Sequence, residues 1–346
     1  MTSPTDIEGG GTAVVVDGEP EPEAKPEAGT LEGRSPGQLM WTRFKRDRTG
    51  VVCAVVVIGY FVVSLLAPLL AKLSGTNPYT LYGQDPTYAD KPILDQFGLP
   101  LGYLGGVSGD HWFGVEPQLG RDLYAQLLYG MRTSLFMALA VTVLTMGTGI
   151  VIGLIGGYFG GRTDYWIGRV TDFFLSFPSQ LFFIAFMPVV TSFFVDPREE
   201  TPTYFRALAM LVVLWVLGWM SMARLVRSTV LSLREREFVE AAKVSGASPA
   251  RIVRKEILPN VVTPILVQFT YQLPSTILTI AFLSFAGVGF VEPTPDWGRL
   301  FAAGARYAQQ DPAFMFFPGI ALVIFILCFN LLGDSVRDAF DPKSGR

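Results

Sequence analysis

The sequence predicts an all-α membrane protein with six transmembrane helices, and three observations lead to that fold class. Half of the 346 residues are hydrophobic and only 16% are charged, with a mean hydropathy of +0.39, which is too apolar for a water-soluble domain. The apolar residues form runs of roughly 17 to 27, the length that a helix needs to cross the hydrocarbon core. These runs do not alternate between apolar and polar residues, which disfavours a β-barrel.

Residues 1–38 are expected to form a disordered, acidic N-terminal tail. This stretch is rich in Glu, Pro, Gly and Thr and nearly lacks aromatic residues, so it cannot bury enough apolar surface to offset the entropy of ordering it. It does not read as a cleaved signal peptide, because it begins with no basic segment followed by an apolar core.

The first span is predicted at about residues 50–70, within a segment 39–73. It follows the basic stretch WTRFKRDRTG, and cytoplasmic flanks of membrane helices are rich in Lys and Arg. We therefore expect the N-terminus in the cytoplasm. The cations at this edge are Arg43, Lys45, Arg46 and Arg48.

Five further spans are predicted within a core at residues 131–333, at about 134–158, 173–194, 207–226, 262–288 and 316–332. Acidic residues dominate the segment 74–130, so we expect it outside the cell. The tail 334–346 returns to the cytoplasm. The connection after the fourth span belongs there too, because it carries eight cations: Arg224, Arg227, Arg234, Arg236, Lys243, Arg251, Arg254 and Lys255.

The extracytoplasmic segment is expected to lead into the second span rather than to form a domain of its own. Its His111 is the only histidine of the chain and neighbours Trp112 and Phe113. A lone histidine is a poor metal site, so we expect it at the membrane interface with these aromatic residues.

Two short helices are predicted where the charged stretch EAAKVSGASPARIVRKEILPN, residues 240–260, interrupts the apolar core. The first helix runs from about 234 to 245 within a loop 234–260. Its apolar side has the spacing of one helical face and consists of Phe238, Ala241, Ala242 and Ser245. Gly246 suits the left-handed residue that ends such a helix.

A second helix follows at once and is expected to run to about residue 256. Ser248 suits the N-cap, Pro249 suits the first helical position, and Pro259 is expected to end the helix before the fifth span. Small residues and cations on such an element fit either a docked protein or anionic lipid headgroups, and these two explanations are equally good on this ground.

The spacing of this stretch resembles a signature of permease subunits of ATP-binding-cassette importers. EAA is followed by three residues, Gly246, ten residues, and then Ile257, Leu258 and Pro259. Three other stretches resemble the dipeptide, oligopeptide and nickel permeases of that family: HWFGVEPQLGRDLYAQLLYGMRTSL, DFFLSFPSQLFF and NLLGDSVRDAFDPK. The chain therefore resembles their C-type permease over residues 41–343.

The resemblance implies a type I importer architecture in the plasma membrane of a bacterium, with a coupling helix between the fourth and fifth spans that contacts an ATPase. It implies a heterodimer with a second permease, two ATPase subunits or one fused ATPase, and an extracytoplasmic solute-binding protein. It implies di- or oligopeptide cargo, with nickel, glutathione or another small solute as the alternative. The implied coupling residues are Glu240, Ala241, Ala242, Ser245, Gly246, Ser248, Pro249, Arg251, Ile257, Leu258 and Pro259.

The chain itself is not expected to be an enzyme or to bind a cofactor. None of its seven lysines follows a glycine, so it lacks a phosphate-binding loop, and ATP and Mg are expected in the partner subunits. A secondary, ion-coupled transporter is the rival class. Such a protein normally carries ionisable residues within its spans, and the predicted spans have almost none away from their ends.

Polar residues of the fifth predicted span are candidates for a translocation pathway: Gln268, Tyr271, Gln272 and Ser275. Amides and hydroxyls can bond a passing peptide without the cost of a buried charge. Hydrogen bonds between helices are an equally good explanation for the two glutamines. Glycines of the second span are expected to permit close helix contact: Gly149, Gly153, Gly156 and Gly157.

Overall fold

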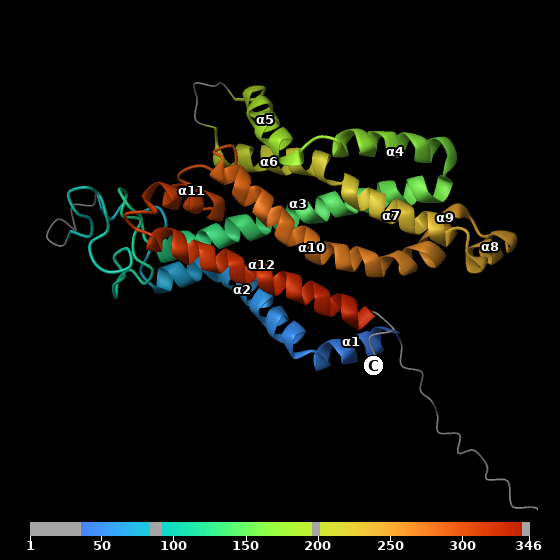
Figure 1. Cartoon of the computed structure of the whole chain (residues 1–346), viewed down its shortest axis with the longest axis horizontal. Coiled ribbons are helices and arrows are strands. Elements are labelled where there is room, and N and C mark those ends of the chain that lie inside the picture. Colours follow the sequence, from blue (N-terminus) through green and yellow to red (C-terminus); the bar gives the residue numbers. More distant parts are fainter. Residues whose placement is uncertain (1–35, 84–91, 196–200, 341–346) are drawn as a thin grey trace, which may run out of the picture.

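The chain is described here by a computed structural model, which covers residues 36–83, 92–195 and 201–340 (Figure 1). Most of the predicted tail, residues 1–35, lies outside the described residues, but its last three residues are helical. The described part contains two isolated β-bridges and no strand. Its helices are α1 (Pro36–Arg46), α2 (Arg48–Leu73), α3 (Leu123–Phe159), α4 (Gly161–Leu175), α5 (Ser179–Ser192), α6 (Thr203–Gly218), α7 (Met220–Leu233), α8 (Glu237–Val244), α9 (Pro249–Ile252), α10 (Leu258–Phe285), α11 (Trp297–Tyr307) and α12 (Ala313–Phe340).

Five helical stretches are long and apolar enough to cross a membrane. They contain four of the predicted spans completely and most of the fifth predicted span, so the all-helical membrane fold is confirmed. α6 with α7 forms one stretch, and α9 with α10 forms another. The five are Arg48–Leu73, Leu123–Phe159, Thr203–Leu233, Pro249–Phe285 and Ala313–Phe340.

The third predicted span, 173–194, is not a straight helix. It is divided between the end of α4 and α5, whose axes meet at 86°. Pro178 stands between them, has no N–H to donate and restricts the residue before it, so a continuous helix is disfavoured there. Within the described residues, five helical stretches therefore have the length and composition of a membrane span, or six if the bent pair crosses as one unit.

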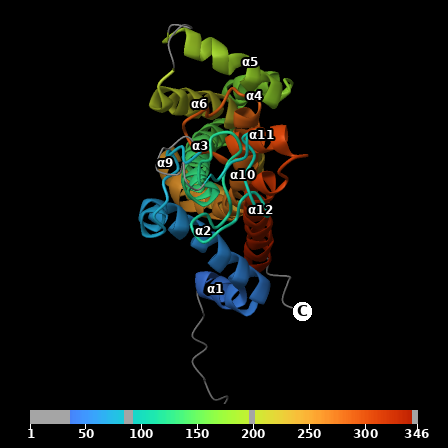
Figure 2. The same cartoon turned by 90° about the vertical axis from the view of Figure 1, so that its left-hand side faces the viewer.

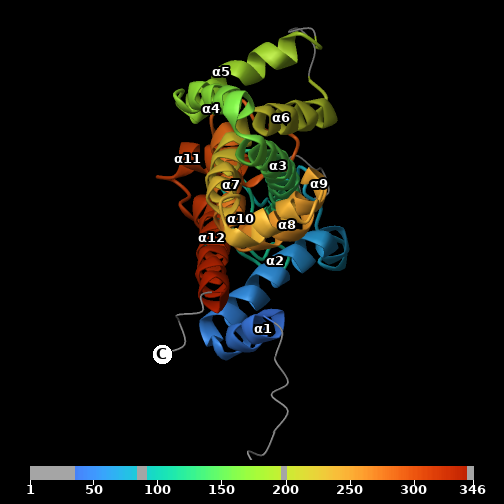
Figure 3. The same cartoon turned by 90° about the vertical axis from the view of Figure 1, so that its right-hand side faces the viewer.

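The long helix α3 lies at the centre of the bundle, with α4, α5 and α6 on one side and α2 and α12 on the other (Figure 3). Glycines bring it into contact with α7: a Cβ atom on Gly149, Gly153 or Gly157 would lie 2.6 to 2.7 Å from a side-chain carbon of α7. Gly156 instead faces Ile167 of α4. The prediction of close helix contact is confirmed for this series.

A unit of tight turns, residues 74–83 and 92–122, lies at the opposite end of the molecule from α8 (Figures 1 and 2). His111 is buried within it, with Nδ1 2.8 Å from Oδ2 of Asp122 and its ring against Tyr82. Asp122 is the N-cap of α3 and accepts a hydrogen bond from the Ala125 amide at 2.7 Å. The expected interfacial position of His111 is therefore wrong, because its ring is buried and hydrogen-bonded to Asp122, the residue that caps α3.

Candidate functional site

The turn after α8 has the geometry that its sequence predicts. Gly246 has φ +76°, its amide donates to the Lys243 carbonyl, and the Ala247 amide donates to the Ala242 carbonyl, both at 3.0 Å. These two bonds form a Schellman motif, which satisfies carbonyls at a helix end. The helix begins at Glu237 rather than at 234, because Arg234 is the C-cap of α7 and Arg236 the N-cap of α8.

The second helix differs from its prediction at both ends. Ser248 occupies the N-cap and Pro249 the first helical position, but the Ser248 side chain makes no capping hydrogen bond. Pro259 does not end the helix, because a π-helical turn, Val253–Ile257, joins α9 to α10. A wider π turn accommodates a residue that lacks an N–H and whose ring would clash with the carbonyl four residues earlier.

Buried side chains fasten this helix pair to the bundle. Val239 of α8, Ile252 of α9 and Ile257 are each at most 1% exposed. They pack in one cluster with Val226 and Val230 of α7. The sequence analysis missed Val239 and Ile252, although the spacing of Val239 and Ala242 on one face could have indicated this contact. The helix pair is thus firmly attached to α7 and α10.

Most of the predicted apolar side of α8 is turned outward, because the helix packs through Val239, and Ala242 is the one residue of the predicted side that contacts the bundle. Phe238, Ala241 and Ser245 are exposed. Of the other implied coupling residues, Ile257 is buried and Leu258 partly buried, whereas Glu240, Gly246, Ser248, Pro249, Arg251 and Pro259 are exposed. Glu240 forms no ion pair within the described part of the chain. The result is a small-residue surface formed by Ala241 and Ser245, with basic side chains nearby, that another protein could approach closely.

A cavity of about 230 Å³ lies in the middle of the bundle between α3, α5, α10 and the junction of α6 with α7. It brings together two of the four predicted pathway residues, Gln272 and Ser275. Gln268 does not line it. Tyr271 points elsewhere, since its hydroxyl donates to Oδ1 of Asp334 on α12 at 2.6 Å.

The cavity lies where two helices are interrupted. Leu175 and Ser179 stand on either side of the break between α4 and α5, and Gly218 and Met220 flank the break between α6 and α7. Interrupted helices leave backbone groups for a polar ligand to use. The lining contains no charged side chain. The sequence analysis missed its other hydroxyl residues, because four helices contribute them: Thr145, Ser179, Ser221, Thr276 and Thr279.

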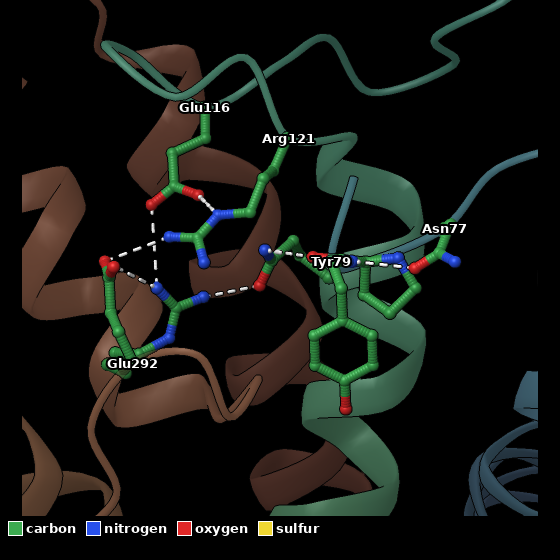
Figure 4. A network of polar contacts seen from close by, with 8 residues as sticks. Asn77, Tyr79, Glu116, Arg121 and Glu292 are labelled. Carbon is green, nitrogen blue, oxygen red and sulfur yellow. Dashed lines mark hydrogen bonds and ion pairs between the residues drawn. The ribbon is translucent and has the colours of Figure 1, made fainter. Parts of the chain in front are cut away.

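An ionic network joins the turn unit to the helices at the end opposite α8, and its members are buried except for the exposed Glu292 (Figure 4). Arg121 lies 2.6 Å from Glu116 and 2.9 Å from Glu292. Arg299 of α11 contacts both carboxylates, at 3.6 and 3.3 Å, and donates to Gln126 of α3. Burial lowers the pKa of the Arg121 guanidinium, but its bonds to the two glutamates outweigh that effect and raise it.

The same network extends from α3 to the chain that precedes it. The Gln126 side chain donates to the Pro78 carbonyl at 2.8 Å, next to the turn in which the Tyr79 amide bonds to Asn77 (Figure 4). Burial lowers the pKa of Arg299, against the attraction of the neighbouring carboxylates. This network fixes the turn unit on α3 and α11, and the sequence analysis missed it because its members are far apart along the chain.

Comparisons with known proteins agree with this architecture. The family model described as "Binding-protein-dependent transport system inner membrane component" matches residues 149–346, and that of the "N-terminal TM domain of oligopeptide transport permease C" matches residues 35–94. A dipeptide transport system permease protein of Alkalihalophilus pseudofirmus is 33% identical over 94% of this chain and 95% of its own.

Two other relatives are similarly close. An oligopeptide transport system permease protein of Escherichia coli strain K12 is 33% identical over 90% of this chain and 93% of its own. A glutathione transport system permease protein of an Escherichia coli O6 strain is 32% identical over 90% of this chain and 91% of its own. Among solved structures, an inward-facing MetNI methionine ABC transporter matches with a TM-score of 0.50 and 20% identity over 62% of this chain and 96% of that one, which shows the shared fold.

Proposed function

Because this chain belongs to the family of binding-protein-dependent transport system inner membrane components, we propose that it is a permease subunit of an ATP-driven importer and forms half of the pathway for di- or oligopeptides. The relatives named as dipeptide and oligopeptide permeases support this cargo. The relative named as a glutathione permease keeps glutathione as an alternative cargo, beside nickel or another small solute.

The feature that carries the proposal is the firmly attached helix pair α8–α9 with its exposed small-residue surface. An ATPase subunit docked on Ala241 and Ser245 would be in contact with a rigid element, because Val239 and Ile252 hold that element against α7 and α10. ATP and Mg would bind to the partner subunits, and this chain would be non-catalytic. Its second permease would complete the pathway.

We propose that the α8 end faces the cytoplasm, together with both termini. α1 and the end of α12 lie toward the α8 end of the molecule, and the turn unit lies at the other (Figure 1). The basic residues of the helix pair support this orientation through the positive-inside rule. The turn unit would then face the solute-binding protein on the outer side of the membrane.

The docking surface can be tested by co-purification in mild detergent. We expect a second permease, one or two ATPase subunits and vanadate-sensitive ATP hydrolysis to accompany the chain. Ala241→Trp should release the ATPase by placing a large side chain on the small-residue surface. Gly109→Trp is the control, since nothing lies within 4 Å of a Cβ there and it belongs to the turn unit. Recovery of the ATPase with Ala241→Trp would contradict the assigned surface.

The pathway can be tested by peptide uptake in reconstituted vesicles. Gln272→Leu removes a hydrogen-bonding side chain from the cavity. Loss of one hydrogen bond to the peptide costs roughly 1 kcal/mol, so we expect uptake to fall by about fivefold. Gln268→Leu is the matched control outside the cavity lining. Equal effects of the two substitutions would contradict the assignment of the cavity to the pathway. Uptake of glutathione and of nickel alone distinguishes the alternative cargoes.

A further inference from the structure

An apolar groove of about 290 Å³ lies between α1, α10 and α12. α1 contributes three of its lining side chains, and the Trp41 and Phe44 rings stack there with their centroids 6.0 Å apart. The single hydroxyl of the lining, that of Thr270, is already bonded to the Val267 carbonyl. The lining residues are Met40, Trp41, Phe44, Leu266, Phe269, Thr270, Val336, Ala339 and Phe340.

The groove lies at the edge of the membrane-spanning region. α1 ends at Arg46, and the first span begins two residues later at Arg48. Val336, Ala339 and Phe340 belong to the last turns of the last span. A groove at this height meets the boundary between lipid headgroups and acyl chains, which is also where tryptophan side chains such as Trp41 are enriched.

Cations stand on both flanks of the part of α1 that faces the groove. At 100° per residue, Met40, Trp41 and Phe44 share one side of the helix. Arg43 and Lys45 fall on the two edges of that side, and the Lys45 ammonium lies 5.1 Å from the centre of the Trp41 ring. Arg46 falls on the opposite side. The groove therefore offers an apolar channel with positive charge at its rim.

We propose that this groove is a binding site for one anionic phospholipid. An acyl chain would lie against Phe44, Phe269 and Ala339, and the phosphate would meet Lys45. Juxtamembrane cations attract anionic headgroups, and apolar burial holds the chain. The site is independent of the cargo and of the ATPase surface, because none of its residues lies in α8, α9 or the central cavity.

The test uses the fluorescence of Trp41 in the full chain, reconstituted into phosphatidylcholine vesicles. A small fraction of phosphatidylglycerol with brominated acyl chains is added, since bromine quenches a tryptophan that it contacts. Subtraction of the Trp41→Phe signal isolates the quenching of Trp41. We expect this quenching to saturate at a low fraction of phosphatidylglycerol and to exceed that by brominated phosphatidylcholine at the same fraction.

Matched variants separate charge from general lipid contact. Lys45→Gln should raise the half-saturating fraction by about fivefold, the effect of one juxtamembrane cation, whereas Arg46→Gln on the far side of α1 should leave it unchanged. Ala339→Leu should fill the groove and abolish the saturable part, with the thermal unfolding midpoint as a check on folding. Equal quenching by both brominated lipids would overturn the proposal in favour of ordinary lipid contact. Absence of quenching by either lipid would overturn it in favour of a protein segment in the groove.

Discussion

Substitution of Gly246 by valine tests the turn between α8 and α9 by straining its backbone conformation. Nothing lies within 4 Å of a Cβ atom at this position, so the new side chain meets no neighbour. The residue has φ +76°, which an L-amino acid adopts at a cost of about 1–2 kcal/mol, and a β-branched residue fits it worst. A penalty of that size shifts the population of the native turn by roughly fivefold to thirtyfold.

The chain contains a matched position at the far end of α10. Gly287 has φ +80°, also has open space around its Cβ, and ends its helix with the same pair of amide bonds, from Gly287 to Ser284 and from Val288 to Leu283, both at 3.0 Å. Gly287→Val should therefore impose a similar backbone strain on a turn away from the proposed ATPase surface. Gly246→Asn is the second control, because asparagine tolerates the left-handed conformation.

The assay compares peptide uptake and ATP hydrolysis of the reconstituted complex with the thermal unfolding midpoint of each variant. Gly246→Val should lower uptake by about fivefold to thirtyfold, Gly246→Asn should stay near the parent, and all variants should insert into the membrane. Gly287→Val should lower the unfolding midpoint as much as Gly246→Val does, with a smaller loss of uptake per ATP hydrolysed. Normal uptake by Gly246→Val would refute the role of this turn.

Three further predictions concern the bundle. Asp164→Asn breaks the partly buried pair of α4 with Arg227 and should destabilise the protein by about 1–2 kcal/mol in thermal unfolding, whereas Asp172→Asn, in an exposed pair with Arg224, should cost less than about 1 kcal/mol. Gly153→Ala should destabilise by about 1–3 kcal/mol because its Cβ would lie 2.7 Å from Val226, and Gly147→Ala, with open space, should not; stability equal in both would contradict the α3–α7 contact. Hydrogen bonds from Ser335 and from the first turn of α2 lower the pKa of Asp47, so its stabilisation is present above the ordinary pKa and is lost as the pH falls below about 4. The unfolding midpoint of Asp47→Asn should depend less on pH in that range. An unchanged pH dependence would contradict the stabilising role of the hydrogen bonds to Asp47.

Local rules predicted the parts of the fold that depend on neighbouring residues. The left-handed Gly246 and the first-turn Pro249 follow from backbone chemistry, and five spans follow from hydropathy. The same rules failed at Pro259, because a π turn absorbs the missing hydrogen bond, and at the third span, where Pro178 breaks the helix. Hydropathy counts apolar residues along the chain and does not register such a bend.

Contacts between distant segments could not be predicted from the sequence. Arg121 and Glu292 form an ion pair across 171 positions, and no local spacing relates them. Val239 was missed for a related reason: the apolar residues of α8 lie on more than one side, and the packing of α7 decides which side is buried. Burial of a short helix is thus a property of the bundle rather than of the helix.

Two helices connect the proposed ATPase surface to the central cavity. α7 begins with Met220 at the cavity and ends at Leu233, so at 1.5 Å per residue it is about 20 Å long. A movement of α8 would be transmitted to the cavity over that length. Val230 lies near its far end, in the cluster that holds Val239 of α8. α10 makes the second connection, from the buried Ile257 to Gln272 at the cavity.

These two connections cannot move independently of the rest of the bundle. The glycines of α3 allow its backbone to lie directly against α7. Close-packed interfaces of this kind shift between discrete arrangements rather than deforming gradually. A displacement of α8 by an ATPase would therefore move α7 together with α3, and with them Ser221 and Thr145, which line the cavity. The breaks beside the cavity, between α4 and α5 and between α6 and α7, are the places where such a movement can change the cavity without bending a continuous helix.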